Sequence, residues 1–556
     1  MAAAFPPIGV GAFALVAAWP LVLAARRRER LMRVAAGVLV GVVPMNVWFQ
    51  WWAWEVSSAG MPVMVAYLSV YPALFVWLMG RSTLLVPRAP GWLLAAVLCV
   101  GVEMLKGQVV FHGYPWYLLG QPLVCLLWPV GATLGMYGGS LVVAVASLLA
   151  LQVIESTGTR VKAGGAHGDG PARRGAIFGL VGMVVAVVAL WFVAAPPGGG
   201  DLVRVAVVQT NVPQSNKMFG TFDERLADFS TALRLTSEAA HREPKPDFIV
   251  WPETMFPGTS LSPGVVEEER RSGLGYREKN FPLTGWHDEL VQVQGDLGIP
   301  LVVGSIAVEG FKIFMEDQGP RFEQEKVFNS AFVINAGRVQ RDRYDKVHLT
   351  PFGETMPYIS AWKWLEQQLL AIGAAGMEFN LSEGESTAPL VVPGAGTSWR
   401  VAAPICFEAT MPAVVRRLVF DGATRKADVM VNLTNDGWFT GSVGARENHL
   451  LAARWRCAEL GTPMVRAANT GVSCVIDARG GVTHRGPTAE PGGGPDSTRG
   501  VRGAMVEGVM SAEVRLPPKD GRPTLYAVVG NVTGWLAMLG TLLLWAGAIA
   551  AGRRNG

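Results

Sequence analysis

The sequence is poor in charged residues, cysteine and histidine. Only 17% of its 556 residues are charged, half are hydrophobic and the mean hydropathy is +0.30, which argues against a purely soluble protein. Five cysteines and seven scattered histidines, without C-x-x-C or H-x-x-x-H spacing, argue against a disulfide scaffold and a dedicated zinc site. The net charge of +4 disfavours a nucleic-acid-binding protein. We therefore expect no metal, no cofactor and no nucleic-acid partner.

Charged residues are missing altogether from several long runs: 1–25, 34–54, 56–80, 107–154, 175–200 and 523–552. A helix needs about 20 apolar residues to cross a hydrocarbon layer roughly 30 Å thick. The runs therefore predict a multi-pass α-helical membrane bundle, with seven spans near 8–25, 34–54, 60–80, 91–107, 136–154, 175–195 and 532–551. Residues 108–135 are apolar but broken by proline and glycine, so we expect an interfacial or re-entrant stretch there, with an extra helix as the alternative.

The arginine-bearing loops set the expected orientation, because short cytoplasmic loops are enriched in Lys and Arg. Four such segments, 26–30, 81–88, 160–174 and 553–554, alternate with connections almost free of basic residues. Placing all four inside puts the start of the chain and the whole segment 201–522 outside. The first span has four arginines just after it and none before it, the reverse of a secretory signal peptide, so we expect it to be retained as an anchor.

Between residues 201 and 522 the composition is that of a globular domain, and runs of strand length alternate with helical stretches. This alternation predicts an α/β layered fold. The predicted domains are a helix bundle over 1–200, an α/β domain over 201–522, and a last spanning helix with a short cytoplasmic tail over 523–556. The expected strands are 203–209, 247–251, 301–308, 328–335, 400–404, 428–433, 463–468 and 472–476, and the expected helices are 223–241, 285–295, 410–420 and 446–460.

Three short motifs follow predicted strands, where α/β folds commonly place catalytic groups. They are Trp251-Pro252-Glu253-Thr254, the stretch from Lys346 to Glu354, and Ile405-Cys406-Phe407-Glu408. A thiol with a reference pKa of about 8.5 needs a base or a nearby cation to be a good nucleophile near neutral pH. Glu253 can supply the base and Lys346 the cation, and a helix expected to start beside Cys406 would favour the thiolate.

Each of these three residues also has an ordinary structural explanation. An isolated cysteine is more often a small buried apolar residue than a nucleophile. An isolated Glu or Lys is more often a surface charge or half of a structural ion pair. Their joint occurrence in the order Glu, Lys, Cys, each at a strand end, favours the catalytic interpretation.

The order of the motifs resembles that of the nitrilase superfamily, whose members carry a Glu-Lys-Cys triad on an αββα sandwich. A nitrilase-like domain joined to an N-terminal helix bundle and one C-terminal helix resembles the apolipoprotein N-acyltransferase family of bacterial lipoprotein maturation. Strings along the whole chain carry the resemblance: Phe5-Pro6-Pro7-Ile8-Gly9, Gly113-Tyr114-Pro115-Trp116, Gln209-Thr210-Asn211-Val212-Pro213-Gln214, the three motifs above, Asn435-Asp436-Gly437-Trp438-Phe439 and Arg466-Ala467-Ala468-Asn469-Thr470-Gly471.

The resemblance implies a role for each motif residue. Glu253 would be the general base, Lys346 the cation that stabilises the tetrahedral intermediate, and Cys406 the nucleophile, with Glu354 and Glu408 beside them. The sequence departs from the family at Phe407, where Tyr is common, at Met218, where a Trp is expected, and at Asn448, where Gln is commoner. The family usually has one more helix before Phe5, so we expect that helix to be missing from this chain.

The implied reaction suits a membrane-anchored enzyme. Cys406 would take an acyl chain from a phospholipid donor, and the thioester would pass it to the α-amino group of the N-terminal diacylglyceryl-cysteine of an apolipoprotein acceptor. The implied location is the bacterial inner membrane, with the catalytic domain on the periplasmic side. No cofactor takes part.

The stretch from Tyr358 to Phe379 is too apolar for an ordinary exposed connection. It is either a core helix or an arm that dips into the bilayer surface and admits lipid to Cys406. In the second interpretation Trp362 and Trp364, together with Met218 and Trp438, line the substrate entrance.

Three alternatives stay open. Cys457 and Cys474 could form a disulfide, or they could be free buried thiols. A membrane-anchored nitrilase-type amidase acting on a soluble amide would use the same triad but would not need seven spans. A transporter would need ionisable residues within the spans, where Glu103 and Lys106 are almost the only ones.

Overall fold

The computed structural model describes every residue except 163–169, 195–198, 277–278, 318, 356–357, 359–380, 395, 440, 488–504 and 555–556. The chain divides into two compact units. The first consists of Met1–Pro196, Gly441–Glu459 and Thr524–Gly556, and the second of Pro197–Thr440 and Leu460–Pro523. Nearly all of helix α15 (Val443–Leu460) thus has its contacts in the first unit, although its sequence lies within the segment 201–522.

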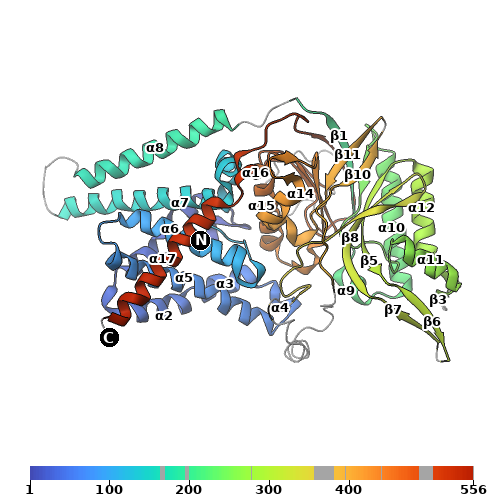
Figure 1. Cartoon of the computed structure of the whole chain (residues 1–556), viewed down its shortest axis with the longest axis horizontal. Helices are drawn as coiled ribbons and strands as arrows, with labels where there is room; N and C mark the ends of the chain where they lie inside the picture. Colours follow the sequence, from blue (N-terminus) through green and yellow to red (C-terminus); the bar gives the residue numbers. More distant parts are fainter. Residues whose placement is uncertain are drawn as a thin grey trace. The chain divides into compact units, whose positions relative to one another are not determined.

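The first unit is a bundle of apolar helices (Figure 1). Within the described residues, six helical stretches are long and apolar enough to cross a membrane: Leu31–Gln50, Gly60–Leu85, Gly91–His112, Gln121–Thr157, Pro171–Val193 and Val532–Ala550. The helices that make them up are α2 (Leu31–Gly41), α3 (Val43–Gln50), α5 (Gly60–Leu85), α6 (Gly91–Met104), α7 (Val124–Lys162), α8 (Pro171–Val193) and α17 (Val532–Arg554). The C-terminal helix α17 packs against α5, α6 and α7, so the two ends of the chain share one bundle.

Two parts of the predicted membrane topology were wrong. The first expected span, 8–25, is a 3₁₀ helix at Gly11–Val16 followed by the short helix α1 (Trp19–Ala25), and together these are too short to count as a span. The stretch 108–135 is not a single interfacial segment, because α7 already begins at Val124. The break that prolines and glycines predicted is confined to the non-helical residues 113–120 and to Gly135, whose φ of 73° interrupts α7.

The break in α7 at Gly135 is held by side chains of α15. A carboxylate oxygen of Glu459 accepts the backbone N–H of Met136 at 2.8 Å, which satisfies a donor that the interrupted helix leaves without its usual partner. The Trp455 indole donates to the Gln121 carbonyl at 3.0 Å, and any Cβ at Gly139 would clash with the Trp455 ring. Glu459 also forms a fully buried ion pair with Arg456. We call this contact region the α7–α15 junction.

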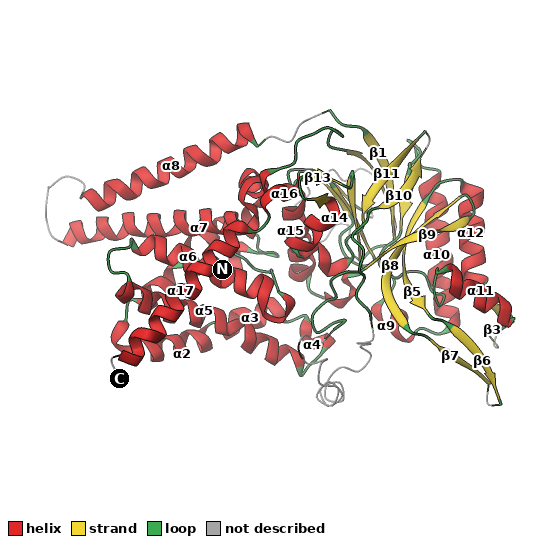
Figure 2. Ribbon diagram, viewed as in Figure 1, coloured by secondary structure: helices red, strands yellow, loops and turns green. Residues whose placement is uncertain are grey.

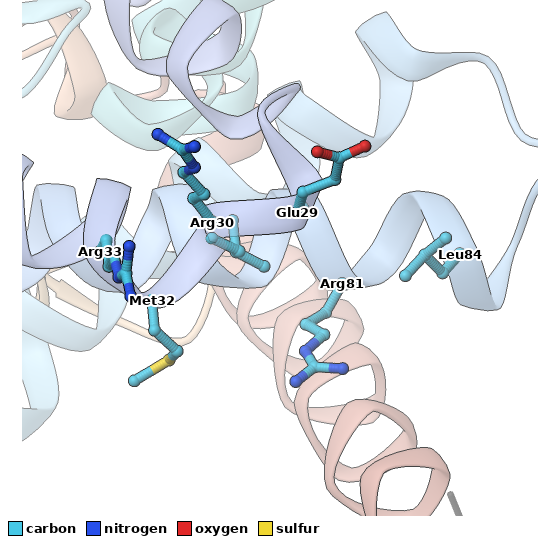
Figure 3. Close-up of a pocket in the computed structure, with 8 residues that line it drawn as sticks. Glu29, Arg30, Met32, Arg33, Arg81 and Leu84 are labelled. Atoms are coloured by element: carbon cyan, nitrogen blue, oxygen red, sulfur yellow. The ribbon is translucent and has the colours of Figure 1, made fainter.

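Two of the arginine-bearing segments, 26–30 and 81–88, meet at one end of the bundle. Arg30, Arg33 and Arg81 lie around a cavity of about 480 Å³ between the start of α2 and the C-terminal end of α5 (Figure 3). Arg26 forms an ion pair of 2.5 Å with Glu155 near the end of α7. Both segments are among those expected from the sequence to lie on the cytoplasmic side.

The second unit contains two six-stranded sheets (Figure 2). The first sheet has the order β18 (Gly508–Arg515), β1 (Leu202–Gln209), β2 (Phe248–Val250), β5 (Leu301–Glu309), β8 (Lys326–Asn335) and β9 (Arg338–Asp345). The second has the order β10 (Leu390–Gly394), β11 (Thr397–Ala402), β14 (Val429–Thr434), β15 (Met464–Ala468), β16 (Cys474–Ile476) and β17 (Val482–Arg485). Each has a parallel centre, β1-β2-β5 and β11-β14-β15, flanked by antiparallel strands.

The two sheets form the inner layers of a sandwich. Strands of one contact strands of the other, as β1 does with β15 and β8 with β10. The outer face of the first sheet is covered by α10 (Phe222–Ala240), α11 (Pro263–Ser272) and α12 (Gly285–Leu297), with the rings of Phe229, Trp251 and Trp286 in the core between them. Helix α14 (Pro412–Val419) follows β11 and the 3₁₀ turn Cys406–Thr410.

The predicted fold class, a membrane helix bundle plus a nitrilase-like αββα sandwich, is confirmed. All eight predicted strands and all four predicted helices of the α/β segment are present, with ends that differ by a few residues. The central parallel strands read as apolar runs because both of their faces are buried. Helix α10 begins where expected because Thr221 and Glu224 form a reciprocal capping box.

Candidate active site

The motif residues lie at the C-terminal ends of strands from both sheets. Glu253 follows β2, Lys346 follows β9, Cys406 follows β11 and Asn435 follows β14. Parallel strands bring such loops to the same edge of a sheet, and the two sheets face each other. Residues from four loops that are far apart in sequence therefore form one cluster inside the second unit.

Glu253 is held by donors on both carboxylate oxygens. The side-chain amide of Asn329 donates to Oε1 at 2.8 Å, and the backbone N–H of Asn435 donates to Oε2 at 2.8 Å. The Glu253 side chain is buried, and its Oε1 lies 3.9 Å from the Lys346 ammonium. These contacts fix the orientation of the carboxylate relative to the cation.

Lys346 is buried and paired with a second carboxylate. Its Nζ lies 2.5 Å from Oε2 of Glu354 and donates to the Thr350 hydroxyl at 3.2 Å. Burial alone would lower the pKa of Lys346, but Glu354 and then Glu253 outweigh it and raise that pKa above its usual value. Burial would likewise raise the pKa of Glu354, but Lys346 brings it below its ordinary range. The Lys346–Glu354 pair is therefore ionised at neutral pH.

Cys406 sits in a strained turn and is protonated at rest. Its φ of 49° places a non-glycine residue in the left-handed region, a conformation that functional turns often keep at an energetic cost. Burial, and then the neighbouring charge of Glu253, raise the pKa of the Cys406 thiol to about 12, against the effects of Lys346 and a hydrogen bond with Thr434. The helix expected to favour the thiolate is a single 3₁₀ turn, Cys406–Thr410, so burial dominates.

Glu408 braces the loops that carry Lys346 and Cys406. Its Oε1 accepts the backbone N–H groups of Val347 at 2.8 Å and His348 at 3.0 Å, and its Oε2 accepts that of Ile405 at 2.8 Å. The Tyr344 hydroxyl donates to the same carboxyl at 2.9 Å. Burial raises the pKa of Glu408 to about 7 despite these donors. The brace ties the residue before Cys406 to the two residues after Lys346.

Of the remaining predicted residues, the structure describes the side chains of Phe407 and Trp438 and not those of Met218, Trp362 and Trp364. Phe407 is buried and its ring stacks on His348, with centroids 6.2 Å apart. Trp438 is half-buried in the 3₁₀ turn Asp436–Phe439 that follows β14. Met218 belongs to helix α9 (Gln214–Phe219), but its side chain lies outside the described residues, as do Trp362, Trp364 and the rest of the apolar stretch after Tyr358.

The alternative of a disulfide between Cys457 and Cys474 does not hold, because both side chains are buried and neither forms a disulfide. In the part of the chain that the structure describes, there is no group of His, Cys, Asp or Glu side chains that could hold a metal ion.

Known proteins are similar to this chain over nearly its whole length. Residues 204–492 match the carbon-nitrogen hydrolase family, and residues 1–149 match the apolipoprotein N-acyltransferase N-terminal domain. The apolipoprotein N-acyltransferase of Geobacter metallireducens is 28% identical over 98% of this chain and 92% of its own length. That of Rhizobium meliloti is 32% identical over 77% of this chain and 70% of its own length.

The chain belongs to the apolipoprotein N-acyltransferase family. The resemblance expected from the motif order is thereby confirmed. An amidase structure from Nesterenkonia is also similar, with a TM-score of 0.33 and 15% identity over 56% of this chain and 92% of the amidase.

Sequence reasoning missed several polar residues of this family member's site. Asn329 bridges Glu253 and Glu354 through one amide nitrogen, at 2.8 and 3.1 Å. Thr434 contacts the thiol, and Lys217 on α9 contacts the Glu253 turn. A signal existed for Asn329 and Thr434, since each is a buried polar residue in a mostly apolar strand. Lys217 gave no such signal.

Proposed function

We propose that this protein transfers a fatty acyl chain from a phospholipid, through a thioester on Cys406, to the α-amino group of a diacylglyceryl-cysteine at the N-terminus of an apolipoprotein. The observation that carries the proposal is the cluster of buried Glu253 and Lys346 with half-buried Cys406 in a chain that also has membrane-spanning helices at both ends. The relatives named above are apolipoprotein N-acyltransferases. Both proposed substrates are held in a membrane, which fits an enzyme anchored there.

In the first half-reaction Glu253 takes the proton of the Cys406 thiol, which is needed because that thiol is protonated at rest. The sulfur attacks the ester carbonyl carbon of the phospholipid. Lys346 and the backbone N–H after Cys406 stabilise the oxyanion. The carbon–oxygen ester bond then breaks, Glu253 returns the proton to the leaving oxygen, and a lysophospholipid departs from the thioester.

In the second half-reaction the neutral α-amine of the apolipoprotein attacks the thioester carbon. Glu253 takes a proton from the amine, the carbon–sulfur bond breaks, and the proton returns to sulfur as the amide is released. Lys346 stabilises the same oxyanion. The enzyme therefore ends each cycle with its three residues in their starting protonation states.

Mass spectrometry of the intact enzyme in detergent tests this proposal. Incubation with a phospholipid should add one acyl mass to the peptide that carries Cys406, and a synthetic diacylglyceryl lipopeptide should then remove the acyl group and appear as the amide. Without phospholipid no adduct should form. Steady hydrolysis of a soluble amide without any acyl adduct would instead identify a membrane-anchored amidase.

The proposed location is the bacterial inner membrane, with the second unit on the periplasmic side, because the arginine loops that meet at one end of the bundle favour the cytoplasmic face. In a background with Cys125 and Cys406 replaced by alanine, Arg28→Cys should resist a membrane-impermeant thiol reagent in spheroplasts, whereas Lys312→Cys on the exposed strand β6 (Lys312–Glu316) should be labelled. The reverse labelling pattern would contradict this orientation.

A further inference from the structure

A second lysine contacts the loop that carries Glu253. Lys217 lies on the short helix α9, between β1 and α10. Its Nζ donates to the backbone carbonyl of Glu253 at 3.4 Å and to the Thr254 hydroxyl over a shorter distance. Thr254 has a φ of 48°, which is strained for a β-branched residue. The two hydrogen bonds therefore hold the peptide of Glu253 and Thr254 in a turn that it would not adopt freely.

Lys217 adds a second positive charge beside the Glu253 turn. Lys346 is matched by Glu354 at 2.5 Å, whereas it lies 3.9 Å from Glu253. Lys217 interacts electrostatically most strongly with Glu253, then with Cys406 and Glu354. Besides Lys217, the charged groups that act on Cys406 are Glu253, Lys346 and Asp436, and Glu408 acts on Lys346. Burial lowers the pKa of Lys217, as expected for an ammonium in poorly solvated surroundings, and Glu253 opposes that effect.

We propose that Lys217 is a positioning residue for the reaction: it clamps the Glu253–Thr254 turn and thereby holds a positive charge beside Glu253 and Cys406. This inference rests on the proposed role of Glu253 as the base. When the thiol proton moves to Glu253, negative charge moves from the carboxylate to the sulfur. A cation that interacts with both groups offsets the charge before and after the transfer.

Three substitutions separate the clamp from the charge. Lys217→Arg keeps a positive donor, Lys217→Gln keeps a donor without charge, and Lys217→Met removes both. Lys245→Met is the matched control, because Lys245 is a solvent-exposed lysine of the same unit outside the cluster. Two rates are measured in the full-length protein in detergent: alkylation of Cys406 by iodoacetamide as a function of pH, read by peptide mass spectrometry, and acylation by phospholipid.

Lys217→Met should slow alkylation at neutral pH by about tenfold or more and move its pH profile upward by about one pH unit, since one unit of pH is a tenfold change in thiolate. Acylation should fall at least as much. Lys217→Gln should show the same pH displacement, whereas Lys217→Arg and Lys245→Met should keep the parental profile.

Two results would overturn the inference: parental alkylation and acylation in Lys217→Met, or equal losses in all three Lys217 variants with lowered melting temperatures and an unmoved pH profile, which would mean a purely structural role. The alkylation readout does not depend on an acyl donor. If the parent forms no acyl adduct while Lys217→Met still displaces the alkylation profile, the proposed function fails and the role of Lys217 stands.

Discussion

Cys406→Ala is expected to abolish both the acyl adduct and acyl transfer to the lipopeptide, because no other thiol lies with Glu253 and Lys346 in the described site. Intact-protein mass spectrometry and a transfer assay measure the two losses. Cys406 keeps its strained turn as alanine, since both residues carry a Cβ and meet the same steric restriction at positive φ, so the fold should persist.

The matched controls are Cys457→Ala and Cys474→Ala. Both thiols are fully buried and neither is in a disulfide, so their removal should lower the melting temperature slightly through lost packing and leave the adduct in place. Normal transfer by Cys406→Ala would refute the thioester mechanism.

The second large effect is expected from separating Glu253 and Lys346 by role. Glu253→Gln removes the base, and it also puts an amide nitrogen against one of two donors, Asn329 or the Asn435 N–H. Acylation should therefore fall by at least the roughly 10²–10⁴-fold typical of general base catalysis. Lys346→Met removes the oxyanion cation, so both half-reactions should fall on the order of 10²–10³-fold or more. Single-turnover acylation and aminolysis rates measure these losses.

Because Lys346 is buried, its replacement should also change the melting temperature of the protein. A solvated pocket would leave the melting curve of both variants close to the parent, but Lys346 is only 1% exposed. Lys346→Met would leave Glu354 buried without its counterion, and breaking such a pair costs about 3–5 kcal/mol. The double variant Lys346→Met/Glu354→Gln restores neutrality, so its melting temperature should recover while acylation stays low.

One outcome would reassign these residues. If Glu253→Gln and Lys346→Met acylate normally from phospholipid and fail only at aminolysis, Glu253 and Lys346 would belong to the acceptor site. Cys406 would then need a different activating group.

The sequence predicted the α/β layers and the cluster because both depend on local patterns. Apolar runs mark the buried parallel strands, and Glu253, Lys346 and Cys406 each follow such a run within a few residues. The supporting contacts could not be predicted in this way. Asn329 reaches Glu253 from a position 76 residues away and Asn435 from 182 residues away, so their pairing is a property of the folded sheets.

The membrane helices could be predicted where an apolar run is long and unbroken, and not where the helix depends on side chains from another part of the chain. Unbroken apolar runs gave α5 and α8 correctly. The run 108–135 contains prolines and glycines that break an isolated helix, yet α7 continues through Gly135 because Glu459 supplies the missing acceptor for Met136. That acceptor is 323 residues away in sequence, so no local sequence pattern predicts it.

The α7–α15 junction also bears on how the enzyme is made. The chain enters the second unit at residue 197, leaves it for α15 and returns at Leu460, so α15 lies within the sequence of the second unit but has its buried contacts with α7. A fragment cut at residues 201 and 522 would carry the Arg456–Glu459 pair and the Trp455 ring without the helix that buries them. We therefore expect the segment 201–522, expressed without the helix bundle, to leave α15 unpacked even though it carries every strand of both six-stranded sheets.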